Sequence, residues 1–337
     1  MKKLETDEDV NMLLHAQAAS AALGAAITTG LLWLLAEKPM RAEDILEALK
    51  IPGKRGHYWL QYLQQFGVLD YVPEGYIPAA VIRSAILDKN NMESWQHIVI
   101  DEQEKDACVH GLPQLIGEPG SLWTLQGLEE PISYVDRMRA SPERAREFTQ
   151  MLFRVHQNLA SQVADLVDLS GVETMMDLGG NSGVISMALL RKFPSVTSTV
   201  VDIANVCAAG REIVAEQGFT DRIKFQAAEF FLDELPTGFD LVLQCDVGIY
   251  GIEILKIIKR SLNPGGRLIY VDHLSPAENL APASRVEWTF LDSLRDPDYG
   301  FPTVDELISQ LGQVGFQVVG EIQTLGNGLK FLQARAN

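Results

Sequence analysis

The residues best suited to chemistry lie at positions 174–183, which read TMMDLGGNSG. A short apolar run is followed by Asp177, by the glycines Gly179, Gly180 and Gly183, and then by an apolar stretch that can form a helix. Glycine allows positive φ and a close approach of backbone to a ligand, and the first N–H groups of a helix are free to bind one. The pattern predicts a strand, a tight turn and a helix that hold a nucleotide-type cofactor. An ordinary strand-to-helix turn also needs glycine, so the rest of the chain must decide.

A second acidic residue supports the cofactor site. Asp202 follows the apolar run at residues 198–201. It lies about 20 residues after the glycine turn, where dinucleotide-binding folds place a carboxylate that accepts hydrogen bonds from ribose hydroxyls. We therefore expect Asp202 to bind the cofactor together with Asp177 and the three glycines.

Composition limits the classes of partner. The chain has 337 residues and a net charge of -17. This charge opposes binding to nucleic acid, which needs a basic surface, and to anionic lipid. The most apolar stretch, residues 16–35, is rich in small residues and is expected to form a buried helix, not a membrane span. The acidic N-terminus does not resemble a signal peptide.

Cysteine usage is sparse. Cys108, Cys207 and Cys245 have neither the spacing of a zinc site nor that of a disulfide framework. We expect no metal and a cytoplasmic, reducing location.

The first half of the chain predicts a mainly helical domain, residues 1–168. Helices are expected at residues 11–36, at 40–49 and from Pro52 to Gly67, followed by a hairpin formed by residues 68–72 and 76–77. Two short helices and a hairpin form a winged helix. Its second helix has few basic residues, so a dimerising role is favoured over DNA binding. Residues 82–164 are expected to be largely helical and include His156 among aromatic and methionine residues that can line an apolar substrate pocket or form an ordinary helical core.

The second half, residues 169–337, alternates strand and helix signals. Strands are expected at residues 174–176, 198–201, 223–226, 239–243 and 267–271, with helices between them. This alternation predicts a parallel sheet covered by helices on both faces. Two further strands at residues 316–322 and 329–334 lie close enough in sequence to pair antiparallel. The expected fold is a Rossmann-like α/β domain with a seven-stranded, mostly parallel sheet.

The order of these signals resembles the class I S-adenosylmethionine-dependent methyltransferases, in particular the plant-type O-methyltransferase family and its bacterial small-molecule relatives. Residues 31–71 look like the winged-helix dimerisation region of that family, and residues 176–183 are similar to its glycine-rich first motif. Residues 228–231 (AEFF) resemble the segment whose acid and aromatic flank adenine, and residues 262–268 (LNPGGRL) resemble its turn before the fifth strand. The resemblance implies S-adenosylmethionine as cofactor, with Glu229, Phe230 and Gln244 beside it. It also implies a homodimer and a small, apolar or aromatic methyl acceptor.

The resemblance breaks where the family has its base. That base is a histidine in a stretch after the fourth strand, which corresponds here to residues 243–250 (LQCDVGIY), and Gly248 occupies the position of the histidine. Glycine cannot remove a proton. A base can come from elsewhere, with Tyr250 and His156 preferred over His97, His273 and Asp246. An acceptor that is already nucleophilic would need none, because methyl transfer gains much from positioning alone.

Other readings remain open. The chain can bind the cofactor but catalyse hydroxylation, decarboxylation or rearrangement in place of methyl transfer. It can also bind its ligands without catalysing a reaction. A nicotinamide-dependent oxidoreductase fits the turn loosely, but the strict GxGxxG spacing is absent. A ligand-sensing winged-helix regulator is disfavoured by the charge.

Overall fold

The computed structural model describes residues 3–89, 91–104, 106–117, 134–277, 280–294 and 300–337. The chain forms two compact units, Met1–Asp106 and Ala107–Asn337. The sequence placed the boundary later, at residues 168 and 169. The difference arises because helices α10 (Pro142–Val155) and α11 (Gln157–Leu166) pack on α13 (Ala204–Glu216) and α12 (Val184–Lys192). These helices therefore belong with the sheet.

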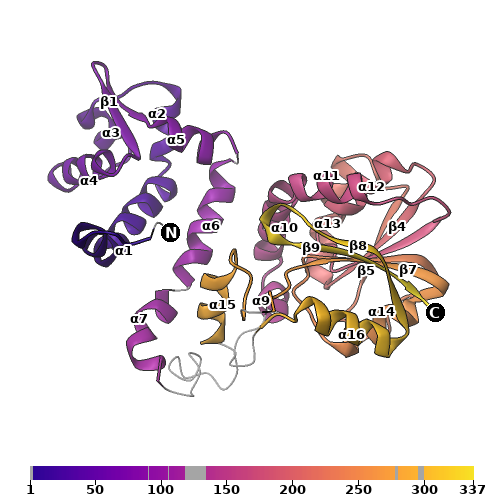
Figure 1. The fold of residues 1–337 in the computed structure, drawn as a ribbon. Coiled ribbons are helices and arrows are strands. Elements are labelled where there is room, and N and C mark those ends of the chain that lie inside the picture. Colours follow the sequence, from indigo (N-terminus) through magenta and orange to yellow (C-terminus); the bar gives the residue numbers. More distant parts are fainter. Residues whose placement is uncertain (1–2, 90, 105, 118–133, 278–279, 295–299) are drawn as a thin grey trace. The chain divides into compact units, whose positions relative to one another are not determined.

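The first unit is a helical unit with one hairpin (Figure 1). Its elements are α1 (Asp7–Thr28), α2 (Leu31–Glu37), α3 (Ala42–Ala48), α4 (Gly53–Gln65), β1 (Leu69–Val72), β2 (Gly75–Pro78), α5 (Ala80–Ile82), the π-helical turn η1 (Arg83–Leu87) and α6 (Met92–Glu104).

The predicted winged-helix arrangement is present in this unit. Strands β1 and β2 pair antiparallel, with Leu69 opposite Pro78 and Val72 opposite Gly75. Gly75 has a φ of +139° and lies against the backbone of Met40, where a Cβ would come within 2.2 Å of the carbonyl oxygen. Only glycine fits there. Leu31, Leu35, Ile45, Leu60 and Leu63 are fully buried and form the core between the helices.

Helix α1 differs from its expectation. A buried helix was expected at residues 16–35. Of the residues of α1, only Ala26 and Ile27 near its C-terminal end are buried. By length and composition α1 could cross a membrane, although the core helix of a protein can pass the same test. Val10, Leu13 and Leu14 are 45–75% exposed and are spaced i, i+3 and i+4, which places them on one side of the helix.

The second unit alternates strands and helices after an opening helical segment. Beyond α10 to α13, its elements are α7 (Asp106–Leu115), α9 (Tyr134–Ala140), β3 (Thr174–Leu178), β4 (Thr197–Asp202), β5 (Ile223–Ala227), β6 (Phe239–Cys245), α14 (Ile252–Ser261), β7 (Leu262–Asp272), α15 (Val286–Ser293), α16 (Val304–Val314), β8 (Phe316–Thr324), the short 3-10 helix η2 (Gly326–Gly328) and β9 (Lys330–Ala336).

One seven-stranded sheet organises this unit, as the sequence predicted (Figure 1). The strand order is β5-β4-β3-β6-β7-β9-β8. The first five of these strands run parallel, whereas β9 is antiparallel to both β7 and β8. The strand order reverses beside β3. In such sheets ligands bind beyond the carboxyl ends of the strands at this switch point.

Alternate residues of the strands face opposite layers of helices. Met175, Val200 and Leu243 pack in one cluster with α11, α12 and α13. Met176 and Val242 face the other cluster, which includes α14 and α16. Burial on both faces explains why these strands read as continuous apolar runs in the sequence. A rigid sheet therefore holds the loops that follow β3, β4, β5 and β6.

Candidate active site

The glycine turn after β3 has the backbone conformation that its residues predict. Gly179, Asn181 and Gly183 have positive φ values of 69°, 48° and 73°. Asparagine is among the residues that tolerate this region. Gly183 then precedes α12 and accepts the backbone N–H of Met187. The turn thus presents its backbone at the switch point of the sheet.

Asp177 supports the turn from beneath. Its side chain is buried and accepts a hydrogen bond of 2.6 Å from the Ser186 hydroxyl on α12. Burial raises the pKa of Asp177 to about 6. Gly180 lies directly above this carboxyl, because a Cβ at Gly180 would come within 2.4 Å of the Asp177 Cγ. Gly180 therefore leaves room for a buried acid.

Replacing Gly180 by alanine is expected to displace the turn and to weaken binding of S-adenosylhomocysteine at least tenfold, because a buried and hydrogen-bonded Asp177 cannot move aside. Overpacking of this kind costs about 1–3 kcal/mol. Calorimetric titration and thermal unfolding measure both effects. Gly312→Ala is the control, since α16 leaves open space around Gly312. Equal ligand affinity in the two variants would contradict the role given to Gly180.

Asp202 at the end of β4 connects the neighbouring strand to the turn. One carboxylate oxygen accepts the backbone N–H of Asn181 at 3.0 Å, and the other accepts the N–H of Ile203 at 2.8 Å. Burial raises the pKa of Asp202 to about 6, against the two N–H groups that stabilise the ionised form. Each carboxylate oxygen retains a lone pair for a further donor.

A cavity of about 670 Å³ opens beside the turn. Of the residues predicted to bind the cofactor, Asp177, Gly179, Gly180, Asp202, Glu229 and Phe230 line it. Glu229 is held by Arg139 of α9, which also pairs with Asp136. The apolar part of the wall includes Val135, Phe148, Leu152, Ile185, Val247 and Ile249.

The cavity suits an adenosyl cofactor. Asn181 Oδ1 and Ser182 Oγ are buried beside it and lack a hydrogen-bond partner among the described residues. Buried polar atoms of this kind need a partner, and ribose hydroxyls and an amino-acid ammonium can supply donors. The site also contains two glycines at which a Cβ would clash with neighbouring side chains. Two carboxylates and an aromatic side chain line the same cavity.

Gln244 near the end of β6 and Tyr250 in the loop after it both lie outside the cavity lining. Gln244 is fully buried in the sheet opposite Leu178 and donates to the Ile249 carbonyl at 2.9 Å, and it does not line the cavity. Tyr250 also lies outside the lining, and its hydroxyl donates to Asp272 at 2.8 Å. Asp272 also accepts the Gly248 N–H at 3.0 Å. Asp272 therefore fixes the loop that carries Gly248 and Tyr250.

His156 is the histidine that lines the cavity. It lies between α10 and α11, and its Nε2 is 3.4 Å from Oδ2 of Asp246. Asp246 has a φ of 53° and lines the same cavity. Burial alone would raise the pKa of Asp246, but the hydrogen bond and charge of His156 and the charge of Arg285 bring it below its ordinary value. The pair joins an imidazole to a carboxylate at the cavity wall.

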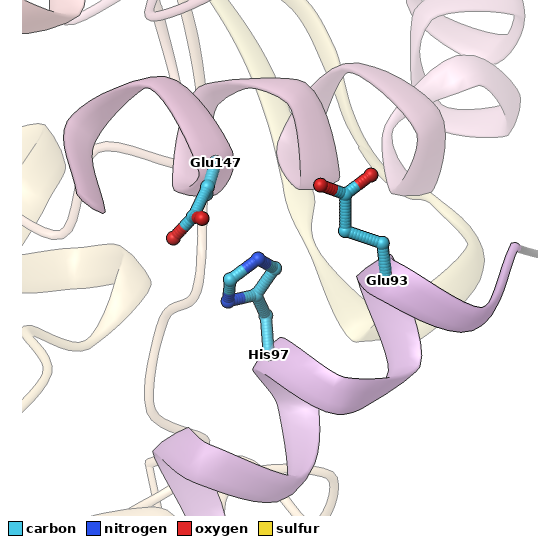
Figure 2. Close-up of side chains that lie close together, drawn as sticks. All are labelled: Glu93, His97 and Glu147. Atoms are coloured by element: carbon cyan, nitrogen blue, oxygen red, sulfur yellow. The ribbon is translucent and has the colours of Figure 1, made fainter. Parts of the chain in front are cut away.

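The remaining histidine candidates are placed differently. His273 is buried, and its Nε2 accepts the Arg285 Nε–H at 2.9 Å, which occupies the lone pair a base would need. His97 belongs to the first unit, one helical turn after Glu93 on α6 (Figure 2). Glu147, drawn in the same view, lies on α10 of the second unit. We therefore assign no metal site to these three side chains.

Comparison with known proteins agrees with the fold. A family profile for the O-methyltransferase domain matches residues 130–290. The chain is 43% identical over 115 residues to the 3-hydroxy-5-methyl-1-naphthoate 3-O-methyltransferase of Streptomyces sahachiroi, an alignment that covers 34% of this chain and 33% of that protein. It is 26% identical to the N,N-dimethyltransferase OxyT of Streptomyces rimosus over 88% of this chain and 87% of that one.

A solved structure has the same fold. The structure of PigF with SAH (S-adenosylhomocysteine) superposes with a TM-score of 0.83 over 98% of this chain and 100% of that one, at 19% sequence identity. At this identity the likeness shows the fold. The profile match includes the glycine turn, Asp202, Glu229 and the segment with Gly248. Over residues 130–290 the chain is therefore similar to the O-methyltransferase domain of the plant-type, S-adenosylmethionine-dependent enzymes, and Gly248 occupies the position where the resemblance expects a histidine.

Proposed function

We propose that the chain methylates a hydroxyl group of a small, largely apolar or aromatic acceptor and that His156 removes the hydroxyl proton. One observation carries this proposal: a single cavity joins the glycine turn and its carboxylates to the His156–Asp246 pair. S-adenosylmethionine, when bound, supplies a methyl group activated by a positively charged sulfur. Asp202 would hold its ribose, Glu229 and Phe230 its adenine, and the backbone of the turn its amino-acid end.

His156 performs the proton transfer in this proposal. The acceptor oxygen gains a methyl group and loses its proton, which passes to the imidazole and from there to solvent. Asp246 offsets the positive charge that His156 acquires, and a positioned base of this kind contributes about 100- to 10,000-fold. Phe148, Leu152 and Ile249 make the wall apolar, which favours an aromatic acceptor and limits water.

The proposal has a direct test in acceptor screening. The chain is incubated with S-adenosylmethionine carrying an isotopically labelled methyl group and a panel of naphthols, hydroxynaphthoates, phenols and amines, and mass spectrometry follows the label. Label on the oxygen of an aromatic hydroxyl supports the proposal. Cofactor binding with no labelled product from any acceptor would favour the non-methylating chemistry instead.

A homodimer is the second part of the proposal. The apolar side of α1 at Val10, Leu13 and Leu14 is exposed in one chain, and a second copy would cover it. Light scattering after size-exclusion chromatography should give twice the chain mass of 37.3 kDa. Leu14→Glu is expected to produce single chains, whereas Val319→Glu, at an exposed position of β8, should not. A wild-type mass of one chain would refute the dimer.

We also infer a cytoplasmic location. Cys207 and Cys245 are free thiols, which a reducing compartment maintains.

A further inference from the structure

The carboxylate of Asp246 lies between two cationic or potentially cationic side chains. Oδ2 is 3.4 Å from His156 Nε2, and Oδ1 is 3.9 Å from an Arg285 terminal nitrogen. The Asp246 side chain is 21% exposed and that of His156 is 24% exposed, so solvent screens the contacts only in part. Each oxygen of one carboxylate therefore serves a different partner.

This arrangement selects one form of the neutral imidazole. A neutral histidine carries its proton on one ring nitrogen, and a carboxylate neighbour favours that proton on the nitrogen facing it. In His156 the facing nitrogen is Nε2, which leaves the lone pair on Nδ1. We propose that Asp246 is a positioning residue that fixes His156 with its proton on Nε2, so that Nδ1 is the base atom, and that Arg285, anchored by His273, holds the Asp246 carboxylate in place. This inference rests on the proposed role of His156 in methyl transfer.

Arg285 is anchored on its other side. It donates from Nε to His273 Nε2, and its guanidinium carbon lies 5.9 Å from the centre of the Trp288 ring. Because His273 Nε2 accepts this bond, the His273 proton must reside on Nδ1. Burial and the charge of Arg285 lower the pKa of His273, which keeps the ring neutral. His273 thus acts as an acceptor that aims Arg285 toward Asp246.

Three other ionisable side chains, Cys245, Asp177 and Asp272, belong to the strands that carry or flank Asp246. Cys245 precedes Asp246, and burial, with the surrounding acids, raises the pKa of its thiol well above the ordinary value, so it is neutral. Asp177 on β3 and Asp272 on β7 have pKa values raised by burial to about 6. Both are mostly ionised near pH 8. Asp246 is the carboxylate in contact with His156.

Nitrogen-15 NMR of the histidine side chains in the full-length protein tests the inference. His156 is assigned by comparison with His156→Gln. The expected wild-type spectrum shows a protonated Nε2 and an unprotonated Nδ1 near pH 8. Asp246→Asn keeps the shape of the side chain, and asparagine tolerates the positive φ. It should lower the share of His156 that carries its proton on Nε2, because a neutral amide is a weaker acceptor than a carboxylate.

Two Arg285 variants separate charge from position. Arg285→Gln loses the charged contact that holds the Asp246 carboxylate and should lower the share of His156 that carries its proton on Nε2. Arg285→Lys keeps a positive charge beside Asp246 and should retain more of that proton position. Glu212→Gln is the control, since Glu212 pairs with Arg146 on the surface and its loss should leave the His156 signals unaltered.

Two results would overturn the inference: a wild-type His156 with its proton on Nδ1, or an unchanged proton position of His156 in Asp246→Asn. Labelled-methyl transfer by the same samples keeps the two proposals apart. Transfer together with the wrong proton position refutes the positioning inference alone. The expected proton position without any transfer refutes the proposed function and leaves the assignment of Asp246 intact.

Discussion

Replacing His156 by glutamine is expected to lower kcat for methyl transfer by about 100- to 10,000-fold, because glutamine fills a similar volume but cannot accept a proton. Binding of S-adenosylhomocysteine should change less than about twofold, since the groups proposed to hold the cofactor are elsewhere in the cavity. Single-turnover kinetics with the labelled cofactor and calorimetry on the same sample separate the two effects. The loss of kcat in His156→Gln should become smaller as the pH rises toward the pKa of the acceptor hydroxyl, because an ionised acceptor needs no base.

Tyr250 provides the matched comparison. Its hydroxyl donates to Asp272, and Tyr250→Phe removes that bond while keeping the ring against Phe301. Losing one hydrogen bond costs roughly 0.5–1.5 kcal/mol, so kcat should fall by about tenfold or less. If Tyr250→Phe abolished turnover while His156→Gln retained it, the base would be Tyr250 and the proposed role of His156 would be wrong.

The second large effect is expected at Asp202. Alanine at this position leaves the backbone N–H groups of Asn181 and Ile203 without their acceptor. An unsatisfied buried donor costs about 1–3 kcal/mol, and the acceptor proposed for the ribose is lost as well. Affinity for S-adenosylhomocysteine should fall by about 100-fold or more, as measured by calorimetry. Asp305→Ala, a carboxylate outside the cavity at the start of α16, should bind normally.

The same residue predicts how binding depends on pH. Burial raises the pKa of Asp202 to about 6, so the carboxyl is ionised above this value and protonated below it. The ionised form is the better acceptor for ribose hydroxyls. Affinity should therefore be constant above about pH 7 and should fall as the pH drops through 6. Asp202→Asn should bind weakly and show a shallower dependence, with the remainder coming from Asp177. A flat profile between pH 5 and 7 in the wild type would contradict this assignment.

Much of the sheet could be predicted because its signals are local. Buried parallel strands read as short apolar runs, and the glycine turn and Asp202 follow two of them directly in the sequence. The seven-stranded, mostly parallel sheet, its antiparallel last pair and the winged-helix hairpin are all confirmed. The sequence order of the strands also brings their carboxyl ends together, which placed Asp177 and Asp202 at one edge.

The contacts that define the proposed chemistry are not local. His156 and Asp246 are 90 residues apart, and their meeting depends on how α10 and α11 pack against the sheet. Because of the same packing, the boundary between the two units lies between residues 106 and 107 and not at the predicted residues 168 and 169. Arg285 and Arg139 were missed for the same reason, since no motif marks either residue.

Gln244 lies apart from the other residues that the sequence predicts to bind the cofactor. The family pattern places a side chain here beside the cofactor, but the register of β6 buries Gln244 opposite Leu178 and Tyr270. Its amide then donates a hydrogen bond to the Ile249 carbonyl in the loop after β6. The face of the sheet that a strand residue occupies depends on the register with both neighbouring strands. The sequence alone does not give this register.

A crystal structure with S-adenosylhomocysteine bound tests the central claim most directly. The account predicts the ligand in the cavity beside Gly179, Gly180 and Asp202, with His156 as the polar side chain facing the space next to the ligand sulfur, where the acceptor oxygen must lie. Asp246 should remain in contact with His156. A ligand whose sulfur faces away from His156, or a different side chain such as Tyr250 at that space, would contradict the account.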